Sequence, residues 1–270
     1  MLTARDVAEA FERICPRESG IKGDELGFVY GDPKTPVTGV ACLWNVHTNS
    51  IRTCISRNLN MLICHESAWM PEQQSPWYDG PTAGEIAPNL MRKQLLDQHR
   101  LVVYRSHSNW DGLPGDGVAD QAVAALGIQG ARMVARQRFF SVQELPCAMP
   151  VQELEGIVER GLGFSRCRVF GDAAKVVRRF AFLIGGFGEN QYNMPQAARD
   201  LGAEALVIGE MSELIVIASL EMGLPVIESL HSVSECPAIR RQAAILAQAI
   251  PEVPVEYVPS GAVAFEIASD

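Results

Sequence analysis

The sequence contains no apolar run that approaches the roughly 20 residues of a membrane-spanning helix. Residues 1–6 also lack the charged-then-apolar order with which a signal peptide begins. Because neither kind of segment is present, we expect a soluble, cytoplasmic protein without a membrane partner.

Clusters of basic residues are missing as well. Lys and Arg together number 23 against 32 Asp and Glu, which gives a formal net charge of −9 at pH 7. A protein that binds a phosphate backbone or an anionic membrane needs a basic surface. The charge balance therefore argues against a nucleic acid as partner.

Cysteine pairs with the spacing of metal or redox motifs are absent. The seven cysteines are an odd number, and no two of them have CxxC spacing. Such a scattered set fits reduced thiols better than a disulfide framework. We expect most of them to be small buried apolar residues.

A phosphate-binding loop of a known pattern is also lacking. The run Gly185-Gly186-Phe187-Gly188 has neither a following Lys-Ser/Thr pair nor a G-x-G-x-x-G frame. It could cradle a phosphate, but a tight turn between a strand and a helix is favoured.

Apolar residues, by contrast, make up 47% of the 270 positions. They recur as short runs that alternate with segments of helical periodicity, at residues 61–63, 101–104, 205–208 and 224–227 among others. This alternation is typical of an α/β protein with a mostly parallel sheet, which binds ligands at the carboxyl ends of its strands. We therefore expect an α/β fold.

The order of strands and helices is similar in the two halves of the chain. This repetition predicts two similar α/β lobes with mostly parallel sheets, at residues 1–129 and 172–270. Between them the pattern changes to two short paired strands and a helix, so we expect an inserted α+β subdomain at residues 130–171.

Two strand ends carry the pair His-Ser with a carboxylate four residues after the histidine. They are His107 with Asp111 and His231 with Glu235. Side chains four residues apart lie on one face of a helical turn, so each pair can reach a common ion or proton. The repeated arrangement predicts a metal or acid–base site in the cleft between the lobes. Each histidine could instead be a buried structural residue that is bonded to a neighbouring carboxylate.

A third strand end carries Cys64, His65 and Glu66. Cys64 could be a thiolate ligand or a small core residue, while Glu66 and His107 are candidate acid–base catalysts. Arg105 precedes His107 by two residues and so shares its strand face. It could bind a substrate carboxylate or phosphate, or make a surface ion pair.

A loop rich in Pro, Trp and Gly follows at residues 69–84, and we expect it to be a lid or a rim. Its Trp69 and Trp77 are expected to pack or to line that rim instead of stacking on a ligand.

Several motifs spread over nearly the whole chain resemble those of a known family. They are Gly39-Val40, Cys64-His65 with Trp69, the run from His107 through Asp111 to Gly127-Ile128, Gly185-Gly186, Gly209-Glu210-Met211-Ser212, and His231 with Glu235. In these motifs the chain is similar to the Ngg-one-interacting-factor-three-like proteins, whose bacterial members often carry the name GTP cyclohydrolase type 2.

The resemblance implies two α/β lobes, a dinuclear metal site between them and a ring-shaped homohexamer. It makes His65, Asp111 and Glu235 ligands of one metal ion, and Glu235 and His231 ligands of the second.

Three positions depart from the family's pattern. Cys64 stands where the family has the first of two adjacent histidines, and a thiolate there would favour zinc or iron. Glu66 replaces a glycine, and Arg105 replaces a small residue.

The pattern favours a metal-dependent hydrolase with one or two divalent ions. We expect it to cleave a C–N bond of a small anionic substrate, as a deaminase, an amidohydrolase or a cyclohydrolase does. The alternatives are a metal-dependent phosphoesterase and a non-catalytic metal-binding or interaction protein.

Overall fold

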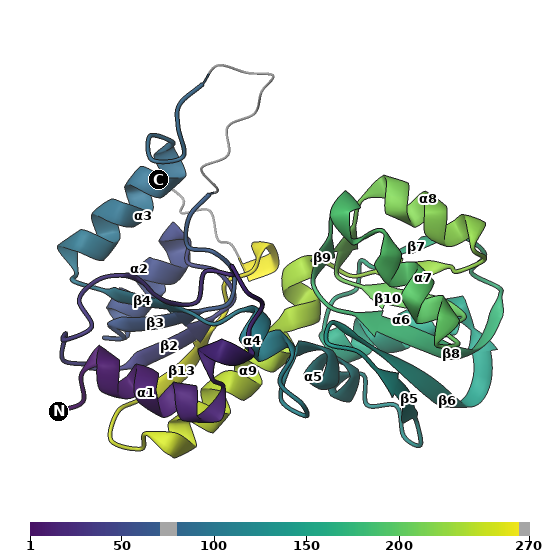
Figure 1. The fold of residues 1–270 in the computed structure, drawn as a ribbon, viewed down its shortest axis with the longest axis horizontal. Helices are drawn as coiled ribbons and strands as arrows, with labels where there is room; N and C mark the ends of the chain where they lie inside the picture. The colour runs from purple at the N-terminus through teal and green to yellow at the C-terminus, as the bar shows by residue number, and fades with distance from the viewer. Residues whose placement is uncertain (71–79, 265–270) are drawn as a thin grey trace. The chain divides into compact units, whose positions relative to one another are not determined.

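The computed structural model describes residues 1–70 and 80–264. The chain forms two compact units, one of residues 1–110 with 239–270 and the other of residues 111–238. Each unit combines helices with a sheet, so the expected α/β class is confirmed (Figure 1).

A five-stranded sheet organises the first unit. Its strands lie in the order β1 (Gly27–Tyr30), β4 (Val102–Arg105), β3 (Met61–Cys64), β2 (Val40–Leu43) and β13 (Val255–Val258). All neighbours are parallel except β1, which runs antiparallel to β4. Every residue of β2, β3 and β4 is buried, as a parallel sheet covered on both faces requires.

Helices cover both faces of this sheet. They are α1 (Ala4–Ile14), α2 (Thr48–Ser56), α3 (Ala87–Gln98) and the C-terminal part of α9 (His231–Ala249), with short 3-10 turns η1 (Arg17–Ser19) and η3 (Ala262–Ala264). Helices α2 and α3 share one apolar cluster with Leu62 and Val103. On the opposite face, the ring of Phe11 in α1 lies 6.1 Å from that of Tyr104. Figure 1 shows α1 and α9 on one side of the strands and α2 and α3 on the other.

The start of α1 is set by its own sequence. Thr3 and Asp6 form a reciprocal capping box, in which each side chain accepts from the other's backbone N–H. The buried side of the helix carries Val7, Ala8 and Phe11. Local sequence therefore sets where this helix begins and which of its sides is buried.

A six-stranded mixed sheet organises the second unit. Its strands lie in the order β5 (Arg132–Arg136), β6 (Phe140–Pro150), β8 (Val176–Leu183), β10 (Ala205–Ile208), β12 (Val226–Glu228) and β7 (Arg168–Phe170). Only β8, β10 and β12 are mutually parallel, and the outer strands pair antiparallel. The expectation of a mostly parallel sheet therefore holds for the first unit and not for the second.

Strand alternation divides this sheet between two apolar clusters. The covering helices are α5 (Val118–Ala125), α6 (Val151–Leu162), α7 (Asn193–Asp200) and α8 (Glu213–Glu221). The unit also contains the 3-10 turn η2 (Glu189–Gln191) and a separate two-stranded parallel sheet of β9 (Gly186–Phe187) and β11 (Glu210–Met211). Leu206 and Ile208 pack with α7 and α8, whereas Ala205 and Val207 pack with α5 and α6.

The unit boundaries differ from the expected division at residues 129 and 171. Residues 130–171 supply β5, β6 and β7 to the same sheet as β8, so they do not form a separate subdomain. Near the C-terminus, β13 pairs with β2 and so belongs to the first unit. Both differences arise from long-range strand pairing, which the local pattern does not reveal.

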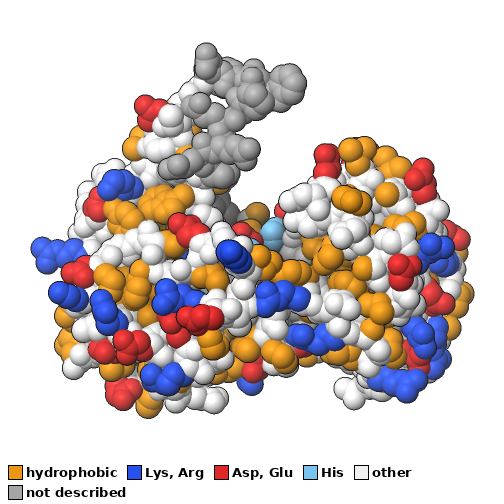
Figure 2. Space-filling view, in the orientation of Figure 1, with side chains coloured by type: hydrophobic (Ala, Val, Ile, Leu, Met, Phe, Trp, Pro, Cys, Tyr) orange, Lys and Arg blue, Asp and Glu red, His pale blue; other side chains and the backbone are white. Residues whose placement is uncertain are grey.

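Two helices carry the chain across the boundary between the units, α4 (Ser108–Asp111) and α9. Among the described residues, every helix is too short or too polar to cross a bilayer. On the face shown in Figure 2, acidic and basic side chains are interspersed over each unit.

Candidate metal centre

His65 follows directly on the buried strand β3, and its side chain is fully buried. Its Nδ1 lies 3.2 Å from the backbone carbonyl oxygen of Ser106. Because a carbonyl only accepts, Nδ1 carries the proton and Nε2 keeps its lone pair. The strand end thus presents a nitrogen that is suited to bind a metal ion.

His107 is held in the same way just beyond β4. Its Nδ1 lies 2.9 Å from Asp24 Oδ2, while its Nε2 lies 3.8 Å from Glu66 Oε1. The rings of His65 and His107 are 4.9 Å apart between centroids. A carboxylate on Nδ1 fixes the tautomer of a metal-binding histidine and raises its basicity. Glu66 and His107, the predicted acid–base pair, are therefore neighbours.

Asp111 ends helix α4 and is buried. Within the first unit, one ring nitrogen of His65 and one of His107 lie within 4.8 Å of each other. Donors bound to one ion at about 2.0–2.2 Å are at most about 4.4 Å apart, so a small adjustment would let both nitrogens bind a divalent ion. The donor set therefore fits a metal ion.

In the second unit, the first turn of α9 brings His231 and Glu235 together as their spacing predicts. His231 Nε2 lies 3.3 Å from Glu235 Oε1, and its Nδ1 lies 3.0 Å from Glu210 Oε1. Glu235 is buried, whereas the side chain of Glu210 is 54% exposed. This pair has the same chemistry as the group around His65.

The glycines of the 185–188 run make room for these side chains. A Cβ on Gly185 would lie 2.3 Å from Glu235 Oε1 and 2.8 Å from His231 Nε2. A Cβ on Gly186 would lie 2.8 Å from His231 Nδ1. Gly185 also has a φ of +59°, which favours glycine. The backbone of Gly185 and Gly186 thus packs directly against the side chains of His231 and Glu235.

Asp24 is a residue of this site that the sequence did not single out. It lies in an irregular loop, and besides His107 it accepts a hydrogen bond from the backbone N–H of Ser108 at 3.1 Å. Burial acts to raise the pKa of Asp24, but the hydrogen bonds from His107 and Ser108 and the charge of Arg105 outweigh it and hold the pKa well below its ordinary value. No local pattern distinguishes Asp24 from other loop carboxylates.

Arg105 is buried, and it contacts protein groups that the sequence did not predict. Its Nη1 donates to Asp24 Oδ1 at 2.7 Å and to the backbone carbonyl of Glu25 at 3.0 Å. Its Nε donates to the backbone carbonyl of His65 at 3.1 Å. An ion pair is the alternative that the sequence left open for Arg105, although this one is buried and not at the surface. Binding of a substrate anion by Arg105 stays a prediction.

Cys64 lies in the apolar cluster beneath α2 and α3 and has no exposed surface. Burial raises the pKa of its thiol to about 12. Among the described residues, the groups of donor atoms close enough to hold an ion do not include Cys64. The structure thus places Cys64 in the core, as the simpler interpretation expected. A thiolate ligand that would favour zinc or iron stays a prediction.

The expected lid falls only partly within the described residues. Residues 71–79, and Trp77 with them, lie outside these. Trp69 is described, and its ring lies 5.5 Å from that of Tyr30.

The fold and the site define a mixed α/β protein with His and carboxylate clusters that could hold a metal ion. The chain belongs to the Duf34/NIF3 (NGG1p interacting factor 3) family, whose model matches residues 2–261. The resemblance that the motifs indicated is therefore confirmed.

Individual relatives are distant. The chain is 24% identical to a GTP cyclohydrolase 1 type 2 homolog of Clostridium acetobutylicum over 88% of its own length and 87% of the relative's. It is 22% identical to the protein of the same name in Clostridium perfringens, over 87% of each chain. A solved Bacillus cereus protein related to NIF3 superposes with a TM-score of 0.79 at 16% identity, over 99% of both chains, and so shares the fold.

Proposed function

We propose that the protein is a metal-dependent hydrolase that cleaves a C–N bond of a small molecule. The supporting observation is that His65 and His231, the two proposed histidine ligands, each place Nδ1 against an oxygen acceptor. This leaves Nε2 as the ligand atom, which is the arrangement of metal-binding histidines. The names of the curated relatives, GTP cyclohydrolase 1 type 2 homolog, agree with a hydrolase of this kind.

The proposed ligand set is the one that the family resemblance implies. We propose that His65, Asp111 and Glu235 hold one divalent ion, and that Glu235 and His231 hold a second in a dinuclear site. A bound ion would supply Lewis acidity towards the scissile group and lower the pKa of water. Nitrogen and carboxylate donors suit zinc, iron and manganese alike, so this donor set leaves the metal open.

Glu66 is the proposed proton carrier. Its side chain is partly exposed and lies beside His107 Nε2. A carboxylate in this place can accept a proton from the attacking water and return it to the leaving nitrogen. Asp24, through its hydrogen bond to His107, keeps that imidazole in one orientation.

Metal content per chain is the first test. Protein purified without added metal should contain one or two divalent ions per chain, and dialysis against a chelator should remove them. Asp111→Asn should lower the content, whereas Asp200→Asn, a change at an exposed carboxylate of α7, should not. A wild-type content equal to that of the chelated sample would reject the proposal.

Hydrolysis is the second test. Stripped protein with zinc, iron or manganese added back should release ammonia or an opened ring from a panel of cyclic amides, amidines and enamine-type amines. Release of phosphate from nucleotides would instead select a phosphoesterase. Metal binding without any turnover would select a non-catalytic metal-binding protein.

We also propose a homohexamer, on the basis of the family resemblance. In the second unit, Leu214 and Ile217 on α8 are 63% and 47% exposed, and apolar side chains are visible in this region of Figure 2. Exposed apolar groups on one helix are suited to an interface between copies of the chain. Light scattering at micromolar concentration should give six times the chain mass, and a monomer would contradict the proposal.

A further inference from the structure

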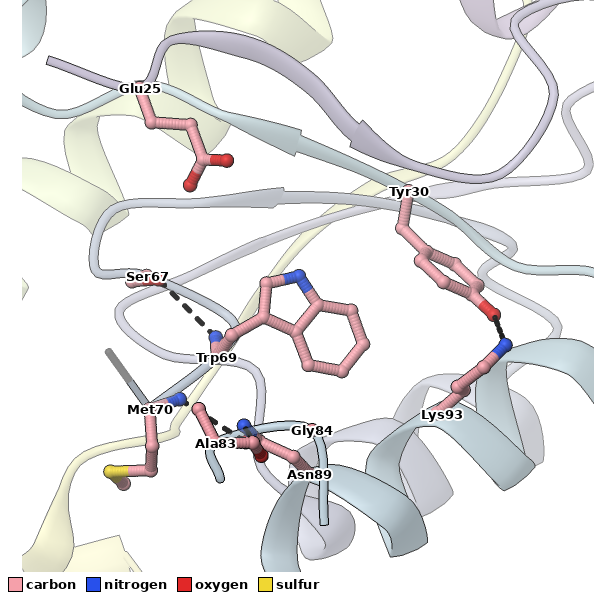
Figure 3. A pocket seen from close by; sticks show the side chains of 9 residues that line it. All are labelled: Glu25, Tyr30, Ser67, Trp69, Met70, Ala83, Gly84, Asn89 and Lys93. Atoms are coloured by element: carbon pink, nitrogen blue, oxygen red, sulfur yellow. Dashed lines mark hydrogen bonds between the residues drawn. The ribbon is translucent and has the colours of Figure 1, made fainter. Parts of the chain in front are cut away.

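A cavity of about 480 Å³ lies in the first unit, next to the strand end that carries His65. Its walls include Glu25, Tyr30, Ser67, Trp69 and Lys93 (Figure 3). Two wall residues adjoin the candidate metal centre along the chain, because Glu25 follows Asp24 and Ser67 follows Glu66. The volume falls in the range of about 300–1,000 Å³ that is usual for small-molecule sites.

The cavity has an aromatic wall. The rings of Trp69 and Tyr30 are 5.5 Å apart with an angle of 60° between their planes. In Figure 3 the indole lies at the centre of the lining residues, with the Glu25 carboxylate pointing into the space beside it. An indole face in a cavity of this size can hold a flat ring by stacking.

The charges on the walls are not equivalent. Lys93 Nζ lies 3.1 Å from Tyr30 Oη and 3.1 Å from Asp97 Oδ2, so the positive charge is paired. Among the described residues, the Glu25 carboxylate has no hydrogen bond or ion pair from a side chain. The cavity therefore offers a hydrogen-bond acceptor with a net negative charge, which repels anions and attracts N–H donors.

Arg105 holds the backbone of the residue that carries this acceptor. Its guanidinium donates to the backbone carbonyl of Glu25 and to Asp24 Oδ1, and it also donates to the carbonyl of His65. One buried side chain therefore ties the loop that carries Glu25 to the strand end that carries His65. We assign Arg105 the role of a positioning residue.

We propose that this cavity is a substrate subsite for a flat nitrogen heterocycle with an amidine-like N–C–N edge. The two N–H groups of that edge donate to the Glu25 carboxylate, and the ring lies on Trp69. A carboxylate accepts two parallel N–H bonds, which adds geometric selectivity to the charge. The inference rests on the proposed C–N hydrolase function and specifies the substrate class of that function.

Binding of two matched probes tests the subsite without any turnover. Protonated 2-aminopyridine presents its ring N–H and one amino N–H on the N–C–N edge, whereas protonated 2-methylpyridine has the same shape with the ring N–H alone. Both probes are therefore titrated at a pH at which they are protonated. Calorimetric titration of metal-stripped protein should show that wild type prefers 2-aminopyridine by about 10-fold, as a charge-assisted pair of hydrogen bonds would give. Glu25→Gln should remove this preference, whereas Glu9→Gln, at an exposed position of α1, should preserve it.

Trp69→Phe should weaken the binding of both probes to the same extent, so the preference for 2-aminopyridine should not change. A thermal melt checks that this variant is folded. Equal wild-type affinities for the two probes, or an unchanged preference in Glu25→Gln, would overturn the subsite. Because the assay needs neither metal nor hydrolysis, the probe preference stands even if no hydrolase activity is found. Conversely, hydrolysis without that preference would overturn the subsite alone.

Discussion

Each unit of the protein holds a strand-end histidine by the same contact but with a different partner. His107 Nδ1 lies 2.9 Å from Asp24 Oδ2, and His231 Nδ1 lies 3.0 Å from Glu210 Oε1. The side chain of Asp24 is 13% exposed, whereas that of Glu210 is 54% exposed. The distances are nearly equal, so the energetic difference between the two contacts must come from their surroundings.

Those surroundings hold the two histidines by different means. In the first unit Asp24 is anchored by the buried guanidinium of Arg105, so an ion pair fixes the position of the carboxylate. In the second unit His231 and Glu235 are seated against the backbone of Gly185, which leaves no space for a Cβ. One histidine is thus placed by charge and the other by steric fit.

The largest effect is expected from Asp24→Ala. The change leaves the buried Arg105 guanidinium without its carboxylate, so we expect a loss of about 3–5 kcal/mol in the free energy of unfolding. Urea unfolding of the metal-free protein measures it. Glu25→Ala is the control, because Glu25 is exposed and should change stability by less than about 0.5 kcal/mol. Equal stabilities of the two variants would show that the ion pair does not anchor this unit.

Gly185→Ala tests the close packing of His231 and Glu235 against the backbone in the second unit. The added methyl group would displace Glu235 and His231, and we expect zinc affinity to fall about 10- to 100-fold with a stability loss of about 1–3 kcal/mol. Zinc titration of stripped protein measures the affinity. Gly188→Ala is a matched control, since the nearest atom to its Cβ would be Asn190 Oδ1 at 3.3 Å. If both variants bind zinc as wild type does, the packing of His231 and Glu235 against Gly185 has no role in zinc binding.

Glu210→Gln should be milder than Asp24→Asn, although each removes one carboxylate from a histidine. Because Glu210 is largely exposed, its ion pair should contribute less than about 1 kcal/mol to stability. Zinc affinity should also fall less than in Asp24→Asn. Parallel unfolding and titration of the two variants compare the contacts directly, and a larger effect at Glu210 would reverse the assignment of the stronger anchor.

Cys64→Ala should have the smallest effect on the metal. The thiol is part of the core beneath α2 and α3, so the variant should bind zinc as wild type does. Loss of the buried sulfur should cost about 1 kcal/mol in unfolding free energy. A marked fall in zinc affinity would restore Cys64 as a ligand.

Features set by local geometry could be inferred from the sequence. The spacing of four residues places His231 and Glu235 on one face of α9, and the capping box of Thr3 and Asp6 marks the start of α1. The short apolar runs mark the strands whose ends carry His65 and His107. Each of these inferences depends on residues within one turn of helix or one strand, where backbone geometry fixes the neighbours.

Tertiary structure alone decided which distant groups meet. Asp24 lies 81 residues from Arg105 and 83 from His107, and no periodicity connects a loop residue to a strand end so far away. The pairing of β13 with β2 assigned the C-terminal strand to the first unit, and burial placed Cys64 in the core. Such contacts depend on the path of the whole chain, because the free energy of burying a charge or a thiol is set by the residues that surround it after folding.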